Sequence, residues 1–104
     1  MKTLLDFEGT AIRLTDERAA HILEHPEMRG MEAEIERILV EPETVVESIS
    51  DPMAHLYYRY CPETSVGAKY LCVVVKIARQ DAFILTAYLT DGIKKGKQLW
   101  PRKS

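Results

Sequence analysis

The spacing of apolar residues changes near Pro42 from a helical period to a strand period, and this change constrains the fold more than any other feature. Before Pro42, apolar residues recur every three or four positions, which is typical of amphipathic helices. After Pro42, runs rich in valine, isoleucine and tyrosine alternate their polarity, which is typical of strands. Helices followed by strands predict an α+β domain.

Two short helices are predicted before Pro42. Thr15 is a good N-cap for the first helix because Asp16 and Glu17 follow it, and Pro26 ends that helix. The second helix is expected over residues 30–40. Its apolar stripe consists of Met31, Ile35, Ile38 and Leu39.

Strands are predicted on both sides of the helices. Residues 4–14 are expected to form a hairpin that turns at Gly9. Four further strands are expected at residues 44–50, 55–61, 69–77 and 82–90. The sequence therefore predicts one domain over residues 1–104, in which the N-terminal hairpin and the two helices pack on one face of a four-stranded antiparallel sheet.

The alternation of residues in these strands predicts which side chains face the helices. The apolar set expected there is Leu71, Val73, Val75, Ile77, Phe83, Leu85, Ala87 and Leu89. The opposite face is expected to hold Tyr57, Arg59, Cys61, Tyr70, Cys72, Val74, Lys76, Ile84, Thr86, Tyr88 and Thr90. Cations, hydroxyls and aromatic rings suit a ligand made of phosphates and bases. An open sheet face with no ligand has a similar composition, so that alternative stays open.

Charge is distributed unevenly along the 104 residues, although the net charge is only −2. Residues 1–51 contain 13 acidic and 5 basic residues, whereas residues 52–104 contain 3 acidic and 9 basic residues. The densest basic segment is the tail at residues 93–104, which includes Lys94, Lys95, Lys97, Arg102 and Lys103. A positive segment of this kind attracts phosphates or simply keeps the tail solvated.

Several classes of protein are not indicated. No apolar run approaches the ~20 residues of a membrane-spanning helix, and no basic-then-apolar leader is recognisable. The two cysteines, Cys61 and Cys72, lack C-x-x-C spacing and are expected to be buried free thiols in a reducing compartment. The expected location is therefore the cytoplasm. There is no glycine-rich phosphate loop and no G-x-S-x-G motif.

Two histidines on the first predicted helix are the best candidates for chemistry. His21 and His25 are four residues apart and share one side of the helix. Histidine transfers protons readily near neutral pH. A pair of histidines at this spacing also suits a metal, but no further ligands are spaced to complete a site, so neither a metal nor another cofactor is expected. The alternative is that both are ordinary surface histidines.

The chain resembles the small stand-alone members of the nuclease-fold superfamily that groups barnase, EndoU, the tRNase colicins and RelE. The resemblance extends over residues 12–100. It is carried by the segments R-L-T-D-E-R-A-A-H-I-L-E-H-P-E-M, I-E-R-I-L-V-E-P-E-T-V, Y-Y-R-Y, K-Y-L-C-V-V-V-K, F-I-L-T-A-Y-L-T and K-K-G-K-Q-L-W. It implies helices packed on a four-stranded antiparallel sheet and cleavage of RNA without a metal.

The resemblance also implies a set of site residues. His21 matches the helix histidine of the family, and His25 follows it. Arg59 matches the strand arginine, and Thr86 with Tyr88 matches the polar pair of the last core strand. These five are the expected catalytic residues. The expected RNA-binding residues are Tyr57, Lys76, Lys94, Lys95 and Lys97. No strand glutamate is present to act as the general base, so a histidine is expected to take that role.

Two functional hypotheses follow. The first is a toxin-like, metal-independent RNA endonuclease that acts on RNA and is restrained by a cognate inhibitor protein. The second is a non-catalytic protein- or RNA-binding module of the same fold, in which an acidic helical face made of Glu24, Glu27, Glu32 and Glu36 contacts a basic partner. Trp100 is expected to anchor the tail to the core, the alternative being that it stacks on a base.

Overall fold

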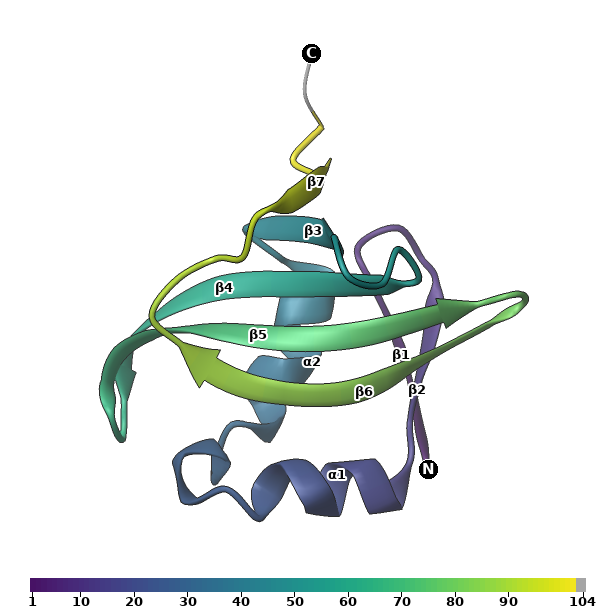
Figure 1. The fold of residues 1–104 in the computed structure, drawn as a ribbon. Helices are drawn as coiled ribbons and strands as arrows, with labels where there is room; N and C mark the ends of the chain where they lie inside the picture. Colours follow the sequence, from purple (N-terminus) through teal and green to yellow (C-terminus); the bar gives the residue numbers. More distant parts are fainter. Residues whose placement is uncertain (103–104) are drawn as a thin grey trace.

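The computed structural model describes residues 1–102, which form one curved sheet with two α-helices beside it (Figure 1). Lys103 and Ser104, the last residues of the predicted basic tail, lie outside the described residues. The helices are α1 (Asp16–Leu23), the 3₁₀ turn η1 (Pro26–Met28) and α2 (Glu32–Val40). The strands are β1 (Lys2–Leu5), β2 (Ala11–Leu14), β3 (Thr44–Ser48), β4 (Ala54–Thr64), β5 (Gly67–Ala78), β6 (Asp81–Thr90) and β7 (Gly96–Trp100).

The prediction of a four-stranded antiparallel sheet is wrong. The described residues form a seven-stranded mixed sheet in the order β1-β2-β6-β5-β4-β3-β7. Neighbouring strands are antiparallel except β2 and β6, which run parallel and pair at Arg13 and Phe83. The N-terminal hairpin therefore extends the sheet instead of packing on its face.

The hairpin joins the sheet through a long-range ion pair. Arg13 Nε and Nη2 donate to the two carboxylate oxygens of Asp81 at 2.9 and 2.7 Å. The same guanidinium lies 5.8 Å from the centre of the Phe83 ring. Because these partners are about 70 residues away along the chain, a pattern confined to short windows of sequence does not reveal them.

The C-terminal strand β7 was also not predicted. Its sequence, GKQLW, is polar at its start and does not alternate like a half-buried strand. It becomes a strand because β3 offers it an edge, with Val46 opposite Gln98 and Glu47 opposite Lys97. At its end, Trp100 packs with its ring centre 4.9 Å from that of Phe7. This contact makes Trp100 an anchor for the tail.

The predicted helices are confirmed. Thr15 caps α1, since its hydroxyl accepts a hydrogen bond from the backbone N–H of Arg18 at 3.2 Å. The helix ends before Pro26, where η1 begins. In α2, the buried residues Ile35, Ile38 and Leu39 belong to the predicted apolar stripe and face the sheet.

Apolar side chains are buried on both faces of the sheet. The larger cluster lies on the helix side and joins residues of α1 and α2 to Tyr57, Leu71 and Val73. The smaller cluster lies on the other face and includes Tyr58 and Cys72, both 0 % exposed. Segment 91–95 crosses this second face on its way from β6 to β7 (Figure 1). That face is therefore covered in part, which the alternation pattern did not predict.

The face assignment of β4 is also wrong. The ladder between β4 and β5 places Tyr57 opposite Val73, Arg59 opposite Leu71 and Cys61 opposite Lys69. Residues directly opposite each other in an antiparallel pair share a face. Tyr57, Arg59 and Cys61 therefore lie on the helix side, and the expected grouping with Tyr70 and Cys72 does not occur.

A bulge changes the facing of β6. Val74 pairs with Thr86 and Val75 pairs with Ile84, so Leu85 is an extra residue in β6. An extra residue reverses the alternation on one side of it. Ala82 and Ile84 consequently join the helix-side cluster, whereas Leu85 packs with the opposite cluster.

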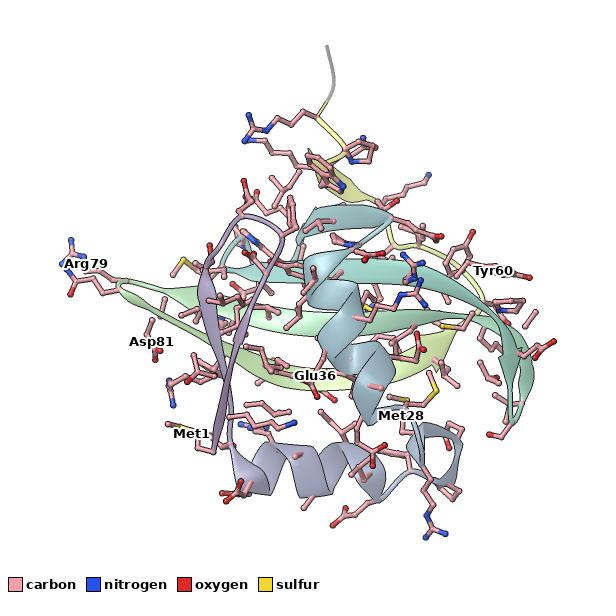
Figure 2. All side chains as sticks on the ribbon, turned by 180° about the vertical axis from the view of Figure 1, so that it is seen from behind. Met1, Met28, Glu36, Tyr60, Arg79 and Asp81 are labelled. Carbon is pink, nitrogen blue, oxygen red and sulfur yellow. The ribbon has the colours of Figure 1, made fainter. Side chains whose placement is uncertain are left out.

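The view from behind shows α2 lying across the sheet, with Tyr60 near the hairpin of β4 and β5 and Arg79 at the tip of the hairpin of β5 and β6 (Figure 2). Both cysteines are buried free thiols, as predicted. Within residues 1–102, neither helix has the length and apolar character needed to cross a membrane.

Candidate functional site

A hollow of about 190 Å³ lies between α1 and the middle of β6 and contains three of the residues that the sequence analysis singled out. We call it the histidine hollow. Its lining consists of Arg18, His21, Ile22, Glu24, His25, Leu85 and Thr86. The structure thus brings three of the five predicted catalytic residues, His21, His25 and Thr86, to one place.

Local structure explains why these groups meet. The Thr15 cap fixes the start of α1, which carries His21 and ends at Leu23. The prediction that His25 shares this helix is wrong, because His25 has extended backbone just before η1. On the strand, the bulge residue Leu85 and its neighbour Thr86, which pairs with Val74, line the hollow beside α1. The Arg18 guanidinium ties the two elements together, because Nη1 donates to the Leu85 carbonyl oxygen at 3.5 Å.

The two histidines differ in their carboxylate neighbours. His21 Nδ1 lies 3.3 Å from Glu24 Oε2, whereas His25 Nδ1 lies 3.9 Å from Glu27 Oε1. The Glu24 carboxylate is the nearer of the two and favours the tautomer of His21 that carries its proton on Nδ1, which leaves Nε2 as the accepting nitrogen. Both side chains are open to solvent, with 69 % of His21 and 68 % of His25 exposed. A large ligand can therefore reach both imidazoles.

Arg59 does not lie in the histidine hollow. It lines a different hollow with Met31, Arg37 and Tyr60, beneath the hairpin of β4 and β5. Its Nη1 atom donates to the carbonyl oxygen of Glu41 at 2.7 Å, at the end of α2. Arg59 therefore joins a strand to a helix terminus in the structure.

Tyr57 is 2 % exposed and lies in the helix-side core. Its hydroxyl donates to Asp6 Oδ2 at 2.7 Å. Burial, followed by the neighbouring Asp6 carboxylate, raises the pKa of Tyr57 far above its usual range. Its predicted place on an open RNA-binding face is wrong.

Tyr88 lies two residues beyond Thr86 on β6, half-buried against the cluster that contains Cys72. Burial raises the pKa of its hydroxyl, with the Cys72 thiol as the next cause, so the neutral form is favoured. Lys76, by contrast, forms an ion pair with Asp51. That pairing neutralises the charge with which Lys76 would attract a phosphate.

The other predicted RNA-binding lysines are exposed. Lys94 and Lys95 lie on the segment between β6 and β7, and Lys97 lies on β7. The backbone N–H of Lys94 donates to the Tyr58 hydroxyl at 3.1 Å. Lys94 and its neighbour Lys95 therefore lie over the sheet face that carries Tyr58. Lys97 lies opposite Glu47, in line with His55 and Val75, and therefore faces the helix side.

Two charged members of the hollow were not predicted as catalytic residues. Arg18 and Glu24 are charged residues on a short helix, a common pattern on solvated helix surfaces. Their spacing from His21, three residues on either side, places all three on one face of α1. This spacing was the sequence signal that could have identified Arg18 and Glu24 as members of the site.

Among residues 1–102, no three histidine, cysteine, aspartate or glutamate side chains gather as a metal-binding group. The comparisons with known proteins found no similar family model, no similar curated protein and no similar solved structure. The resemblance to the nuclease-fold superfamily therefore rests on the quoted sequence segments alone.

Proposed function

We propose that this chain is an RNA endonuclease that cleaves by transesterification at the ribose 2′-hydroxyl, with the histidine hollow as its active site. The observation that carries the proposal is the meeting of two imidazoles, one guanidinium and one hydroxyl in a hollow open to solvent. These are the groups that move a proton to and from ribose oxygens and bind a phosphate.

His21 is the general base in this proposal. Glu24 lies beside Nδ1, so Nε2 is the nitrogen that accepts the proton of the 2′-hydroxyl. The 2′-oxygen then forms a bond to the adjacent phosphorus, and the bond from phosphorus to the 5′-oxygen breaks. His25 gives its proton to that leaving oxygen. The products are a 2′,3′-cyclic phosphate and a 5′-hydroxyl, and the two proton transfers each supply about 10²–10⁴-fold.

Arg18 and Thr86 hold the phosphate. A guanidinium stabilises the negative charge that builds on the phosphoryl oxygens, and its fork geometry matches two of them. The Thr86 hydroxyl is exposed at the opposite wall of the hollow and donates a hydrogen bond to the same group. Tyr88, held neutral by burial, is an alternative proton donor on the adjoining part of β6.

The test is cleavage of end-labelled RNA by the purified chain in the presence of EDTA. We expect products that end in a 2′,3′-cyclic phosphate, and we expect His21→Ala and His25→Ala each to lower kcat by at least about 100-fold. His55→Ala is the matched control, because the third histidine of the chain is on β4 and does not line the hollow. Absence of cleavage at high protein concentration would refute the proposal.

The second candidate function is a binding module without catalysis. It is favoured by the solvent exposure of both histidines, which differs from the enclosed setting of many proton-transfer sites. An RNA that binds in a salt-dependent manner but remains intact would support this alternative. Substitution of His21 would then change the affinity for RNA without changing any rate of cleavage.

A further inference from the structure

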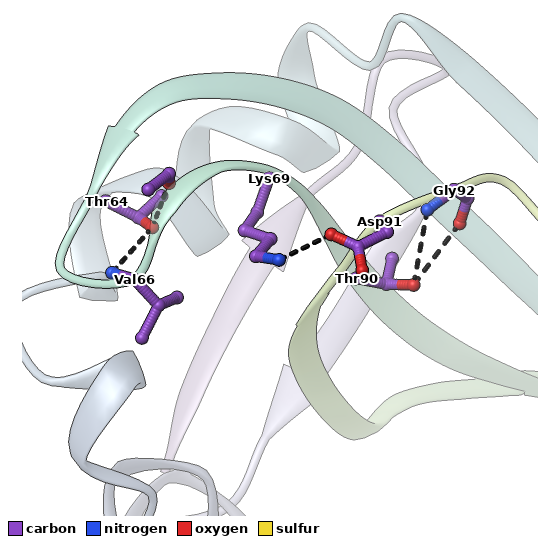
Figure 3. A network of polar contacts seen from close by, with 7 residues as sticks. Thr64, Val66, Lys69, Thr90, Asp91 and Gly92 are labelled. Atoms are coloured by element: carbon purple, nitrogen blue, oxygen red, sulfur yellow. Dashed lines mark hydrogen bonds and ion pairs between the residues drawn. The ribbon is translucent and has the colours of Figure 1, made fainter.

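A basic turn is tied down on the sheet face opposite the helices. Its start is held by an ion pair between Lys69 and Asp91 and by contacts of the Thr90 hydroxyl with the backbone of Gly92 (Figure 3). Further along, the N–H of Lys94 donates to the Tyr58 hydroxyl at 3.1 Å. The turn is therefore anchored at two points rather than free in solvent. We use "basic turn" for residues 91–95.

The basic turn carries two cations that have no acidic partner among the described residues. Both Lys94 and Lys95 are exposed. In contrast, Lys69 and Lys76 are paired with Asp91 and Asp51. The positive charge available to an external anion on this face is therefore concentrated in the turn.

A cross-strand row connects the basic turn to the histidine hollow. Tyr88 on β6 lies opposite Cys72 on β5, and Cys72 lies opposite Tyr58 on β4, which holds Lys94. Tyr88 is also two residues from Thr86 in the hollow. Two strand spacings amount to ~10 Å. The turn is thus too far to touch the scissile phosphate itself but is well placed for phosphates further along the same strand.

We propose that the basic turn is a second phosphate-binding subsite, and that a single strand of RNA runs from the histidine hollow over Tyr88 to Lys94 and Lys95. This inference rests on the proposed function. Tyr58 is a positioning residue, because it holds the backbone of Lys94. The bound RNA is single-stranded in this proposal, because proteins make most of their specific contacts with RNA to unpaired nucleotides.

The experiment measures binding of non-cleavable 2′-O-methyl oligonucleotides by fluorescence anisotropy at several salt concentrations. The double variant Lys94→Ala/Lys95→Ala should bind an octanucleotide about tenfold more weakly. The slope of log affinity against log salt should become shallower by about 1.4, which is the loss of two phosphate contacts on a single strand. The affinity for a dinucleotide, which occupies the hollow alone, should stay unchanged.

Three further variants serve as controls. Lys94→Arg/Lys95→Arg should restore both the affinity and the slope, since the charges remain. Lys76→Ala should change neither, because that lysine is already paired. Tyr58→Phe should weaken octanucleotide binding while preserving the slope, because the charges stay but their position is lost.

The outcomes separate this inference from the proposed function. An unchanged slope in the alanine double variant, or an equal loss for both oligonucleotides, overturns the subsite even if the chain cleaves RNA. Lysine-dependent binding by a chain that never cleaves supports the subsite and refutes the active site. Failure of the unmodified chain to bind the octanucleotide overturns the subsite as well.

Discussion

Arg59 lies directly opposite Leu71 in the ladder between β4 and β5, which places the strand arginine on the same side of the sheet as the helices. Its guanidinium donates to the carbonyl oxygen of Glu41 and is absent from the lining of the histidine hollow. The guanidinium in that hollow belongs to Arg18. In the proposed active site, Arg18 therefore takes the place that the resemblance implies for Arg59.

This difference predicts opposite outcomes for two arginine variants. Arg18→Ala should lower kcat/KM for RNA cleavage by about 10²–10³, the usual loss when one charge-stabilising donor is removed. Arg59→Ala should change kcat/KM by less than about twofold when rates are compared per folded molecule. Steady-state kinetics on a short labelled RNA, with the folded fraction checked by circular dichroism, makes the comparison. A larger loss from Arg59→Ala than from Arg18→Ala would contradict the placement of the site.

The buried hydrogen bond between Tyr57 and Asp6 predicts a loss of stability in alkali. Burial and the Asp6 carboxylate raise the pKa of Tyr57 in the folded state. A raised pKa means that the stabilisation is complete below the tyrosine value of the unfolded chain, ~10, and is lost as the pH rises above that value. The free energy of unfolding, measured with urea, should therefore fall above pH ~10.

Tyr57→Phe isolates this contribution. Near neutral pH the variant should lose about 1–3 kcal/mol, because Asp6 Oδ2 loses its buried donor while Oδ1 keeps the N–H groups of Glu8 and Thr10. Its decline in alkali should be shallower than that of the unmodified chain. An equal decline in both chains would assign the effect to the other buried tyrosines, Tyr58 and Tyr88, whose pKa values burial also raises.

The approach of β7 to β3 predicts a sharp difference between two glycine variants. A Cβ atom at Gly96 would collide with the carbonyl oxygen of Glu47 and the side chain of Val46, whereas one at Gly92 would meet open space. Gly96→Ala should therefore cost roughly 1–3 kcal/mol and loosen β7. Gly92→Ala should be nearly neutral. Thermal unfolding of the two variants tests the prediction, and equal melting temperatures would argue against a paired β7.

The contact between Phe7 and Trp100 predicts that the C-terminal strand contributes to global stability. Trp100→Ala should cost roughly 2 kcal/mol, less than the ~3–5 kcal/mol of a fully buried aromatic, because Trp100 is only partly buried. Trp100→Phe should recover most of this loss. In the unmodified chain, Trp100 fluorescence should shift to the red on unfolding. A Trp100→Ala chain as stable as the unmodified one would refute the anchoring role.

Part of the candidate site could be predicted from the sequence. The sequence was sufficient to place His21 on the first helix, because capping and periodicity are local, but His25 lies beyond the end of α1 in extended backbone. Their proximity to Thr86 could not be derived in this way. This proximity depends on the contact of α1 with β6. The ion pair between Arg13 and Asp81, which are 68 residues apart in the sequence, helps to fix that contact.

The sequence by itself determined where the helices and six of the strands lie, because periodicity, the Thr15 cap and prolines act within a few residues. Tertiary structure decided which face of each strand is buried. One bulge at Leu85 and one register between β4 and β5 were enough to move Ile84 and Arg59 to the helix side. It also made a strand of residues 96–100, since a polar segment adopts strand geometry when an edge with unpaired backbone groups lies beside it.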